Sequence, residues 1–223
     1  MRLIDLALAA MSSFGAIPVW IDTDPSVAPG GHEIDDGVAL LQAFNSPEIA
    51  VRGVSIVFGN ADLPTADRIG REIVSRFGPR GIRVYTGAAG PADIAKETEA
   101  VKALAAALRV EPLVVLALGP ATNVAAVVKL HPELAGRIRE VVAVAGRRPG
   151  QRFTAGAPGG PAFRAFNFEM DPAAFQTLLD SKVKLVFAPW EISSKVWLTK
   201  RDVEDLAGRS AGMKWMLPLA LDW

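Results

Sequence analysis

The sequence Ile17–Asp24 (IPVWIDTD) is followed, after a loop rich in glycine and proline, by Ile34–Phe44 (IDDGVALLQAF). Its first five residues, Ile17–Ile21, form an unbroken apolar run, which is typical of a strand buried on both faces. Apolar residues then recur near helical spacing over Asp36–Phe44, which predicts a helix. Four aspartates therefore stand between the end of a buried strand and the start of a helix.

The rest of the chain repeats this alternation of short apolar runs and longer amphipathic segments. Further strands are expected at Val51–Phe58, Ile82–Tyr85, Leu113–Leu118, Glu140–Val144 and Val183–Phe187. Further helices are expected at Thr65–Phe77, Ala95–Leu108, Thr122–Leu130 and Pro172–Leu179. Strands without polar alternation, separated by helices, predict an α/β fold with an open, mostly parallel sheet and helices on both faces. With no internal repeat or linker, residues 1–223 are expected to form a single domain.

Composition narrows the class of protein. Half of the 223 residues are hydrophobic, and 24 basic residues balance 24 acidic ones. A balanced surface lacks the positive field that nucleic acid or an anionic membrane requires, so neither is expected as a partner. No run reaches the ~18 apolar residues of a membrane span. The first 19 residues faintly resemble a secretion signal, but Asp5 interrupts them and only Arg2 is basic, which favours a soluble cytoplasmic protein.

The aspartates Asp22, Asp24, Asp35 and Asp36 are expected to converge at the carboxyl end of a strand, where open parallel sheets bind ligands. Asp35 taken alone is more simply a helix N-cap or an acidic residue of the first helical turn, favoured by unpaired N–H groups and the helix dipole. Four carboxylates together repel one another unless a cation or a shared proton compensates. Hard cations such as Ca²⁺ prefer oxygen ligands. The absence of cysteine and of paired histidines argues against zinc, so an oxygen-liganded divalent site is the preferred interpretation.

Several segments resemble one known family. WIDTDP, IDDGVALLQAF, VSIVFGN, LALGPATNVAAVVKLHPELAGRIREVVAVAG and FNFEMDPAAFQTLL are similar to segments of the inosine/uridine-preferring nucleoside hydrolases. The resemblance implies a Rossmann-like nucleoside hydrolase fold. It also implies hydrolysis of the N-glycosidic bond of ribonucleosides by a Ca²⁺-bound water, yielding ribose and a free base, as in purine and pyrimidine salvage.

The resemblance also assigns roles at a calcium centre. Asp24 would be a calcium ligand and the general base that activates the water, and Asp36 would be a second ligand. Leu118 would contribute its backbone carbonyl, although its side chain would be strand core in any protein. Asp22 would support the cluster from behind.

Three further residues would bind the ribose by the same resemblance. Asp35 would contact a ribose hydroxyl, Asn60 would lie beside the ribose and Asp24, and Asn167 would donate a hydrogen bond to the sugar. From the residues alone, Asn60 is equally well explained as a turn residue and Asn167 as a loop cap.

The sequence departs from the family pattern in three places. Ser26–Ile34 adds seven residues to a turn that normally has two between the proline and the aspartate pair, and it is interpreted as a surface loop. Ala165 replaces an acidic residue that normally helps to bind the ribose 5′-hydroxyl. The family's late His-Asp pair, which supplies a calcium carboxylate and a leaving-group acid, has no counterpart after Asn167. His131 is expected to start a helix instead, and Asp222 is a weak substitute.

These departures leave the chain as either a fragment or a shortened homologue, and they keep two alternatives open. One is a catalytically impaired or non-enzymatic protein that binds ribosides or metal without turnover. The other is a phosphatase-type hydrolase, although Leu118-Gly119-Pro120 lacks the Thr or Ser that such a site needs. Base preference is not readable. A set of late apolar residues is expected to need a partner, either a missing C-terminal portion or another subunit of a homo-oligomer: Trp215, Met216, Leu217, Leu219, Leu221 and Trp223.

Overall fold

A computed structural model of the chain describes residues 15–30, 32–151, 153–154, 162–163 and 166–223. Its centre is a six-stranded sheet in the order β3-β2-β1-β4-β5-β8, and every neighbouring pair of strands is parallel. The strands are β1 (Ile17–Thr23), β2 (Ile49–Ile56), β3 (Val84–Thr86), β4 (Leu113–Ala117), β5 (Ile138–Ala143) and β8 (Leu185–Phe187). Each lies where the apolar runs predict a strand.

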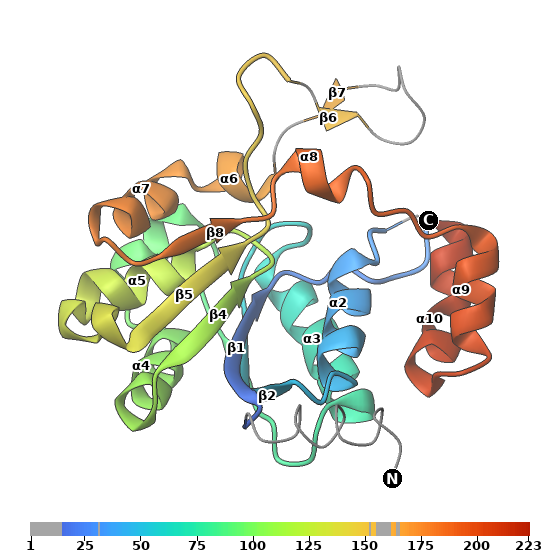
Figure 1. The fold of residues 1–223 in the computed structure, drawn as a ribbon, viewed down its shortest axis with the longest axis horizontal. Helices are drawn as coiled ribbons and strands as arrows, with labels where there is room; N and C mark the ends of the chain where they lie inside the picture. The colour runs from blue at the N-terminus through green and yellow to red at the C-terminus, as the bar shows by residue number, and fades with distance from the viewer. Residues whose placement is uncertain (1–14, 31, 152, 155–161, 164–165) are drawn as a thin grey trace, which may run out of the picture.

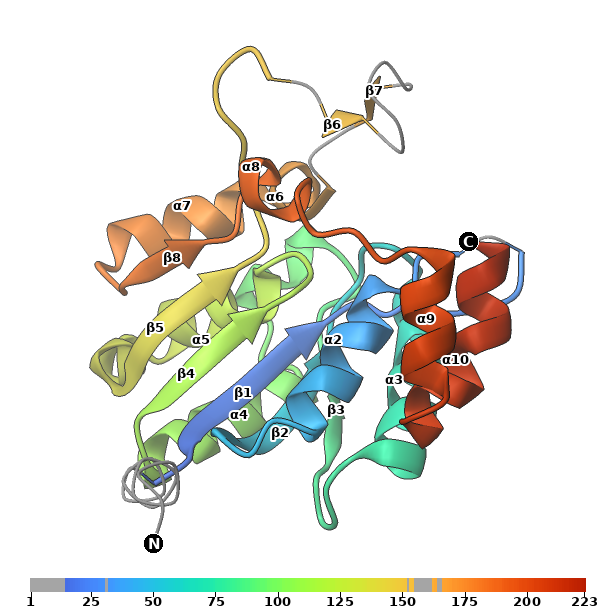
Figure 2. The ribbon, with the colours of Figure 1, turned by 45° about the vertical axis from the view of Figure 1, so that its right-hand side comes forward.

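Helices cover both faces of this sheet (Figures 1 and 2). One face carries α2 (Asp35–Phe44), α3 (Leu63–Phe77), α9 (Lys200–Ala207) and α10 (Ala211–Asp222). The other carries α4 (Glu99–Val110), α5 (Thr122–Leu130) and α7 (Pro172–Asp180). The prediction of an α/β fold with an open parallel sheet between two helical layers is therefore confirmed.

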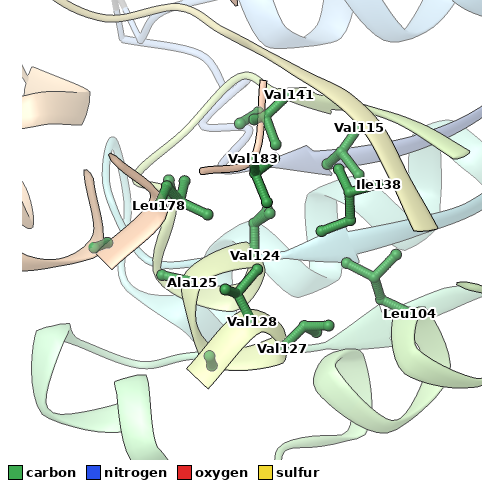
Figure 3. Close-up of a cluster of buried hydrophobic side chains, with 14 of the residues drawn as sticks. Leu104, Val115, Val124, Ala125, Val127, Val128, Ile138, Val141, Leu178 and Val183 are labelled. Atoms are coloured by element: carbon green, nitrogen blue, oxygen red, sulfur yellow. The ribbon is translucent and has the colours of Figure 1, made fainter. Parts of the chain in front are cut away.

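Two hydrophobic cores, one on each face, explain why the strands lack polar alternation. In β1, Trp20 enters the core beneath α4 and α5, whereas Val19 and Ile21 enter the core beneath α2 and α3. Figure 3 shows the first core, where side chains of α5 such as Val124 and Val127 face side chains of the sheet. Burial on both faces requires apolar residues at successive positions.

Several elements are absent from the sequence-based expectation. They are the two-stranded sheet β6 (Phe153–Thr154) and β7 (Ala162–Phe163), the 3₁₀ helix η1 (Pro91–Ala95), and the helices α6 (Phe166–Met170), α8 (Trp190–Ser193), α9 and α10. The 3₁₀ helix η2 (Pro132–Arg137), in contrast, lies where His131 was expected to start a helix. The helix α9 begins with a capping box, in which Thr199 and Asp202 satisfy each other's backbone N–H groups. The helix α10 contains Pro218, which weakens any prediction of a helix from sequence.

The expectation that the late apolar residues need a partner outside this chain is wrong for most of them. Met216 is fully buried, and Trp215 packs its ring against Phe77 of α3, with ring centroids 5.6 Å apart. Leu217 and Leu219 pack on the same core. Only the last two of the set, Leu221 and Trp223, remain exposed.

No helix in the described part of the chain has both the length and the apolar character needed to cross a membrane. The possible secretion signal falls largely on residues 1–14, and the departure at Ala165 falls in the segment 164–165. Both expectations therefore concern residues outside the described ranges.

Candidate functional site

The candidate site lies at the carboxyl end of β1, where the sheet order changes direction. From β1 the chain proceeds outward through β2 and β3, and from β4 it proceeds the other way through β5 and β8. Connections that diverge in this way leave a crevice between β1 and β4, the usual ligand site of open α/β sheets. Asp24 follows β1, and Leu118 follows β4 with its N–H donating to the Asp22 carbonyl at 2.8 Å. The fold thus joins two of the predicted site segments.

Asp24 is fully buried at this crevice. Its Oδ2 accepts a hydrogen bond from the Asn60 N–H at 2.7 Å, whereas its Oδ1 has no hydrogen-bond partner among the described residues. Gly59 and Gly119 lie so close that a Cβ at either position would overlap the Asp24 carboxylate. The backbone is therefore shaped around this side chain, and one of its buried oxygens is left without a hydrogen-bond partner in the described chain.

Asp36 is the second buried carboxylate of the crevice. Its Oδ1 accepts hydrogen bonds from the Thr23 hydroxyl and, at 3.4 Å, from the Asp24 N–H. Burial, together with the charge of Asp35, raises the pKa of Asp36 to about 7, although these hydrogen bonds oppose the shift. Burial also raises the pKa of Asp24 well above its usual value, and repulsion from Asp36 adds to this. Two such carboxylates favour a proton or a cation between them.

Asp35 stands at the first position of α2, at the rim of the site. Its side chain is exposed, yet the surrounding protein partly desolvates the carboxylate and raises its pKa. The N-cap of α2 is Ile34, so Asp35 is not the N-cap, but it is an acidic residue of the first turn, as the structural alternative allows. The neighbouring Glu33 also has a raised pKa, because of burial and of the charge on Asp35. An exposed acid beside two buried ones is open to a ligand from solvent.

Asp22 is fully buried in β1 and is held by side chains that the sequence did not suggest. Its Oδ1 accepts hydrogen bonds from the Ser55 hydroxyl and from Asn123 Nδ2, the latter at 2.8 Å. Ser55 in turn accepts a hydrogen bond from Trp20 Nε1 at 2.8 Å. Burial raises the pKa of Asp22 to about 7, although the hydrogen bonds from Asn123 and Ser55 oppose that shift.

Asn167 reaches the same region from α6. Its Nδ2 donates to the backbone carbonyl of Leu118 and, at 2.8 Å, to that of Val144. The structure therefore brings the predicted ribose contact Asn167 to the predicted calcium ligand Leu118. A carbonyl oxygen has two lone pairs, so the Leu118 carbonyl can accept this bond and still face a cation.

The oxygen atoms of the site suit a hard cation, but they are few. The carboxylates of Asp24 and Asp36 and the Leu118 carbonyl are all oxygen donors. Asp24 Oδ1 and, on the supporting aspartate, Asp22 Oδ2 are buried carboxylate oxygens without a hydrogen-bond partner in the described chain. Within the described ranges, no group of three or more His, Cys, Asp or Glu side chains is placed to hold a metal ion. Calcium usually takes six to eight oxygen ligands. Water and substrate hydroxyls would have to supply much of the shell.

The two late candidates considered in the sequence are engaged elsewhere. Asp222 Oδ2 accepts a hydrogen bond from the Gly30 N–H at 2.6 Å, so it joins the inserted loop 26–34 to α10. Val27 of this loop is buried, and a Cβ on Gly37 would crowd both Val27 and Met216. The loop therefore packs between α2 and α10. His131 lies between α5 and η2 with its Nε2 3.0 Å from Glu97 Oε1, as the prediction of a helix start there allows.

Sequence reasoning missed five residues that contribute to the site: Thr23, Ser55, Asn123, Gly59 and Gly119. Ser55 is a lone polar residue inside an apolar strand, and Asn123 belongs to the motif Gly119–Asn123 (GPATN). Both were visible as polar residues in places where a core would be apolar. Their partners are 33 and 101 residues away in the chain, so only the fold identifies them.

Comparison with known proteins gives a consistent picture. The sequence model of the family described as "inosine-uridine preferring nucleoside hydrolase" matches residues 19–221. The pyrimidine-specific ribonucleoside hydrolase RihA of an Escherichia coli strain is 28% identical over 216 residues, a match covering 85% of this chain and 65% of that relative. The chain thus spans about 65% of the length of the curated relatives it matches.

Solved structures show the same fold. A plant nucleoside hydrolase superposes with a TM-score of 0.75 at 25% identity, covering 92% of this chain and 70% of that one. A purine-preferring ribonucleoside hydrolase from Gardnerella vaginalis gives a TM-score of 0.74 at 19% identity, covering 92% and 71%. The second likeness supports the fold alone.

Proposed function

Because this chain belongs to the inosine-uridine preferring nucleoside hydrolase family, we propose that it hydrolyses the N-glycosidic bond of ribonucleosides to ribose and a free base. The observation that carries the proposal is the state of Asp24. It is a fully buried carboxylate at the switch point of the sheet, beside a second buried carboxylate, with one oxygen that has no hydrogen-bond partner in the described chain. The large majority of buried side-chain polar atoms are hydrogen-bonded, so an oxygen left without a partner beside a second carboxylate supports a ligand at this place.

Asp24 is proposed as the general base. Burial and the charge of Asp36 make its carboxylate more basic than a free aspartate, which suits removal of a proton from water near neutral pH. The Asn60 N–H fixes Oδ2, so Oδ1 is the atom left to receive that proton. As the glycosidic bond breaks, positive charge develops on the ribose, and the carboxylates of the crevice stabilise it.

Calcium is the proposed cofactor, held by Asp24, Asp36 and the Leu118 carbonyl. When bound, it would lower the pKa of a coordinated water and orient the ribose hydroxyls. The repulsion between Asp24 and Asp36 supports a divalent cation here, because a cation favours the ionised form of both groups. Asp22 of β1 is proposed to support Asp24, which directly follows that strand.

Asp35, Asn60 and Asn167 are proposed to bind the ribose. Asp35 is exposed at the rim and can accept a hydrogen bond from a sugar hydroxyl. The Asn167 amide donates to Leu118 and Val144 without ligand, and it would exchange one of these bonds for the sugar. The alternative is a protein that binds ribosides or metal without turnover, which is favoured by the small number of acidic ligands among the described residues.

The test is hydrolysis of inosine, uridine and other ribonucleosides by the purified protein, with calcium and with a chelator. We expect calcium-dependent release of reducing sugar, and none from an Asp24→Ala variant. Equal and negligible release of reducing sugar by wild type and variant would contradict the enzymatic proposal. Binding of calcium or ribose, measured by calorimetry without any turnover, would then support the alternative of a protein that binds ribosides or metal without hydrolysing them.

A further inference from the structure

The first turn of α5 carries two buried polar side chains that the proposed reaction does not use. Thr122 and Asn123 end the motif Gly119–Asn123, directly after the loop that contributes the Leu118 carbonyl. Their exposed fractions are 0% and 1%. Buried polar groups at the start of a helix commonly cap that helix, but no side-chain hydrogen bond caps α5. Their hydrogen bonds lead to other parts of the chain.

Asn123 connects three segments on the aspartate side of the site. Its Nδ2 donates to Asp22 Oδ1 at 2.8 Å and to the Ile56 carbonyl at 3.1 Å, and its Oδ1 accepts from the Ala88 N–H at 2.8 Å. Gly87 leaves the necessary space, since a Cβ there would overlap the Asn123 amide. One carboxamide thus fixes the end of β1, the end of β2 and the segment after β3.

Thr122 points to the other half of the site. Its Oγ1 donates to Asp171 Oδ2 at 2.6 Å, and Asp171 Oδ1 accepts from the Ala174 N–H at 3.0 Å. Asp171 is buried between α6, which carries Asn167, and α7. This pair of bonds therefore anchors the end of the segment that presents Asn167 to Leu118.

We infer that Thr122 and Asn123 are positioning residues, which hold the aspartate half and the Asn167 half of the site at a fixed separation. The inference rests on the proposed function, because it assumes that one ligand contacts both halves. Asp24 lies two residues beyond Asp22 on the same strand end, so a displacement of Asp22 moves Asp24 as well. A misplacement of 1 Å in a catalytic site can cost about 10²-fold in rate.

The test compares Asn123→Ala and Thr122→Val with a control, Val127→Ala. Val127 is buried in the same helix, and its truncation loosens packing without removing a hydrogen bond. The readouts are calcium affinity by calorimetry, kcat and KM for a ribonucleoside, and Tm. For Asn123→Ala we expect weaker calcium binding and a kcat lowered by about 10- to 100-fold. For Thr122→Val we expect an increased KM with calcium affinity unchanged.

A merely structural role predicts a different result. In that case both variants would follow Val127→Ala, with a lower Tm and unchanged kcat, KM and calcium affinity in the folded protein, and the inference would be overturned. If wild type neither binds calcium nor hydrolyses ribonucleosides, the proposed function fails. Crystal structures of the two variants then test the positioning role of Thr122 and Asn123 by itself. Displacement of Asp22 in one and of Asn167 in the other would uphold the inference. An unchanged separation of Asp24 and Asn167 in both would overturn it.

Discussion

Two aspartates of this protein are almost equally buried, but they differ in how many of their carboxylate oxygens accept hydrogen bonds. Asp24 and Asp171 have exposed fractions of 0% and 1%. Asp171 has both carboxylate oxygens hydrogen-bonded, one to the Thr122 hydroxyl and one to the Ala174 N–H at the start of α7. Asp24 has one oxygen bonded to the Asn60 N–H, and the other has no partner in the described chain.

The difference separates a structural carboxylate from a functional one. A buried carboxylate with satisfied oxygens offsets its desolvation locally and stabilises the fold. At Asp24 the desolvation is not offset, and repulsion from Asp36 adds to it. A protein retains such a group at a cost in stability when a ligand or a reaction requires it. Removing each carboxylate should therefore have opposite consequences.

The largest expected effect is the loss of hydrolysis in Asp24→Asn. Loss of a general base typically costs about 10²–10⁴-fold. Because asparagine removes a buried charge that repels Asp36, the variant should unfold at the same Tm as the metal-free wild type or higher. Steady-state assays and thermal unfolding in chelator measure both. A variant with wild-type kcat, or one with a clearly lower Tm, would place Asp24 with the structural aspartates.

Gly119→Ala tests whether the space around Asp24 matters to its role. The added Cβ would overlap the Asp24 carboxylate and must displace it. We expect kcat/KM to fall by about 10²-fold, the typical effect of a small misplacement at a reacting centre. Gly136→Ala is the matched control, because a Cβ at Gly136 meets no atom within 4 Å. Equal activity of the two variants would show that Asp24 does not need its present position.

Asp171→Ala is expected to lower the stability of the protein, in addition to the rise in KM that loss of its bond to Thr122 predicts. The substitution removes an N-cap and leaves the buried Thr122 hydroxyl without its partner, for a combined cost of about 2 kcal/mol. In a protein of this size each kcal/mol lowers Tm by about 2–4 °C. Asp62→Ala removes an exposed N-cap from α3 and should lower Tm less. Thermal unfolding of the two variants compares them, and equal shifts would mean that the buried bond to Thr122 adds nothing.

The sequence predicts the sheet and the position of the site but not the internal support of the site. Unbroken apolar runs such as Ile17–Ile21 identify strands because burial on both faces leaves a local pattern. The family resemblance, not a local pattern, implied that Asn60 lies beside Asp24, and in the structure the Asn60 N–H donates to Asp24 Oδ2 at 2.7 Å. Asp171 could not be told from an ordinary N-cap, and Asn123 could not be linked to Asp22, since a contact across 101 residues leaves no local signal.

The smallest predicted effect, and the most specific to the aspartate cluster, is the pH dependence of stability. Asp22 and Asp36 have pKa values raised from 3.8 to about 7, so between these values the folded chain binds more protons than the unfolded chain. The free energy of unfolding of the metal-free protein should therefore fall as pH rises through this window and level off above about pH 7. Calcium should reverse the trend, since a cation binds the ionised carboxylates more tightly at higher pH.

Urea unfolding at several pH values, in chelator and in calcium, measures how the free energy of unfolding changes with pH in each condition. Stability of the metal-free protein that rose steadily with pH would mean that Asp22 and Asp36 are ionised without a cation, and the contrast between Asp24 and Asp171 would then lose its electrostatic basis.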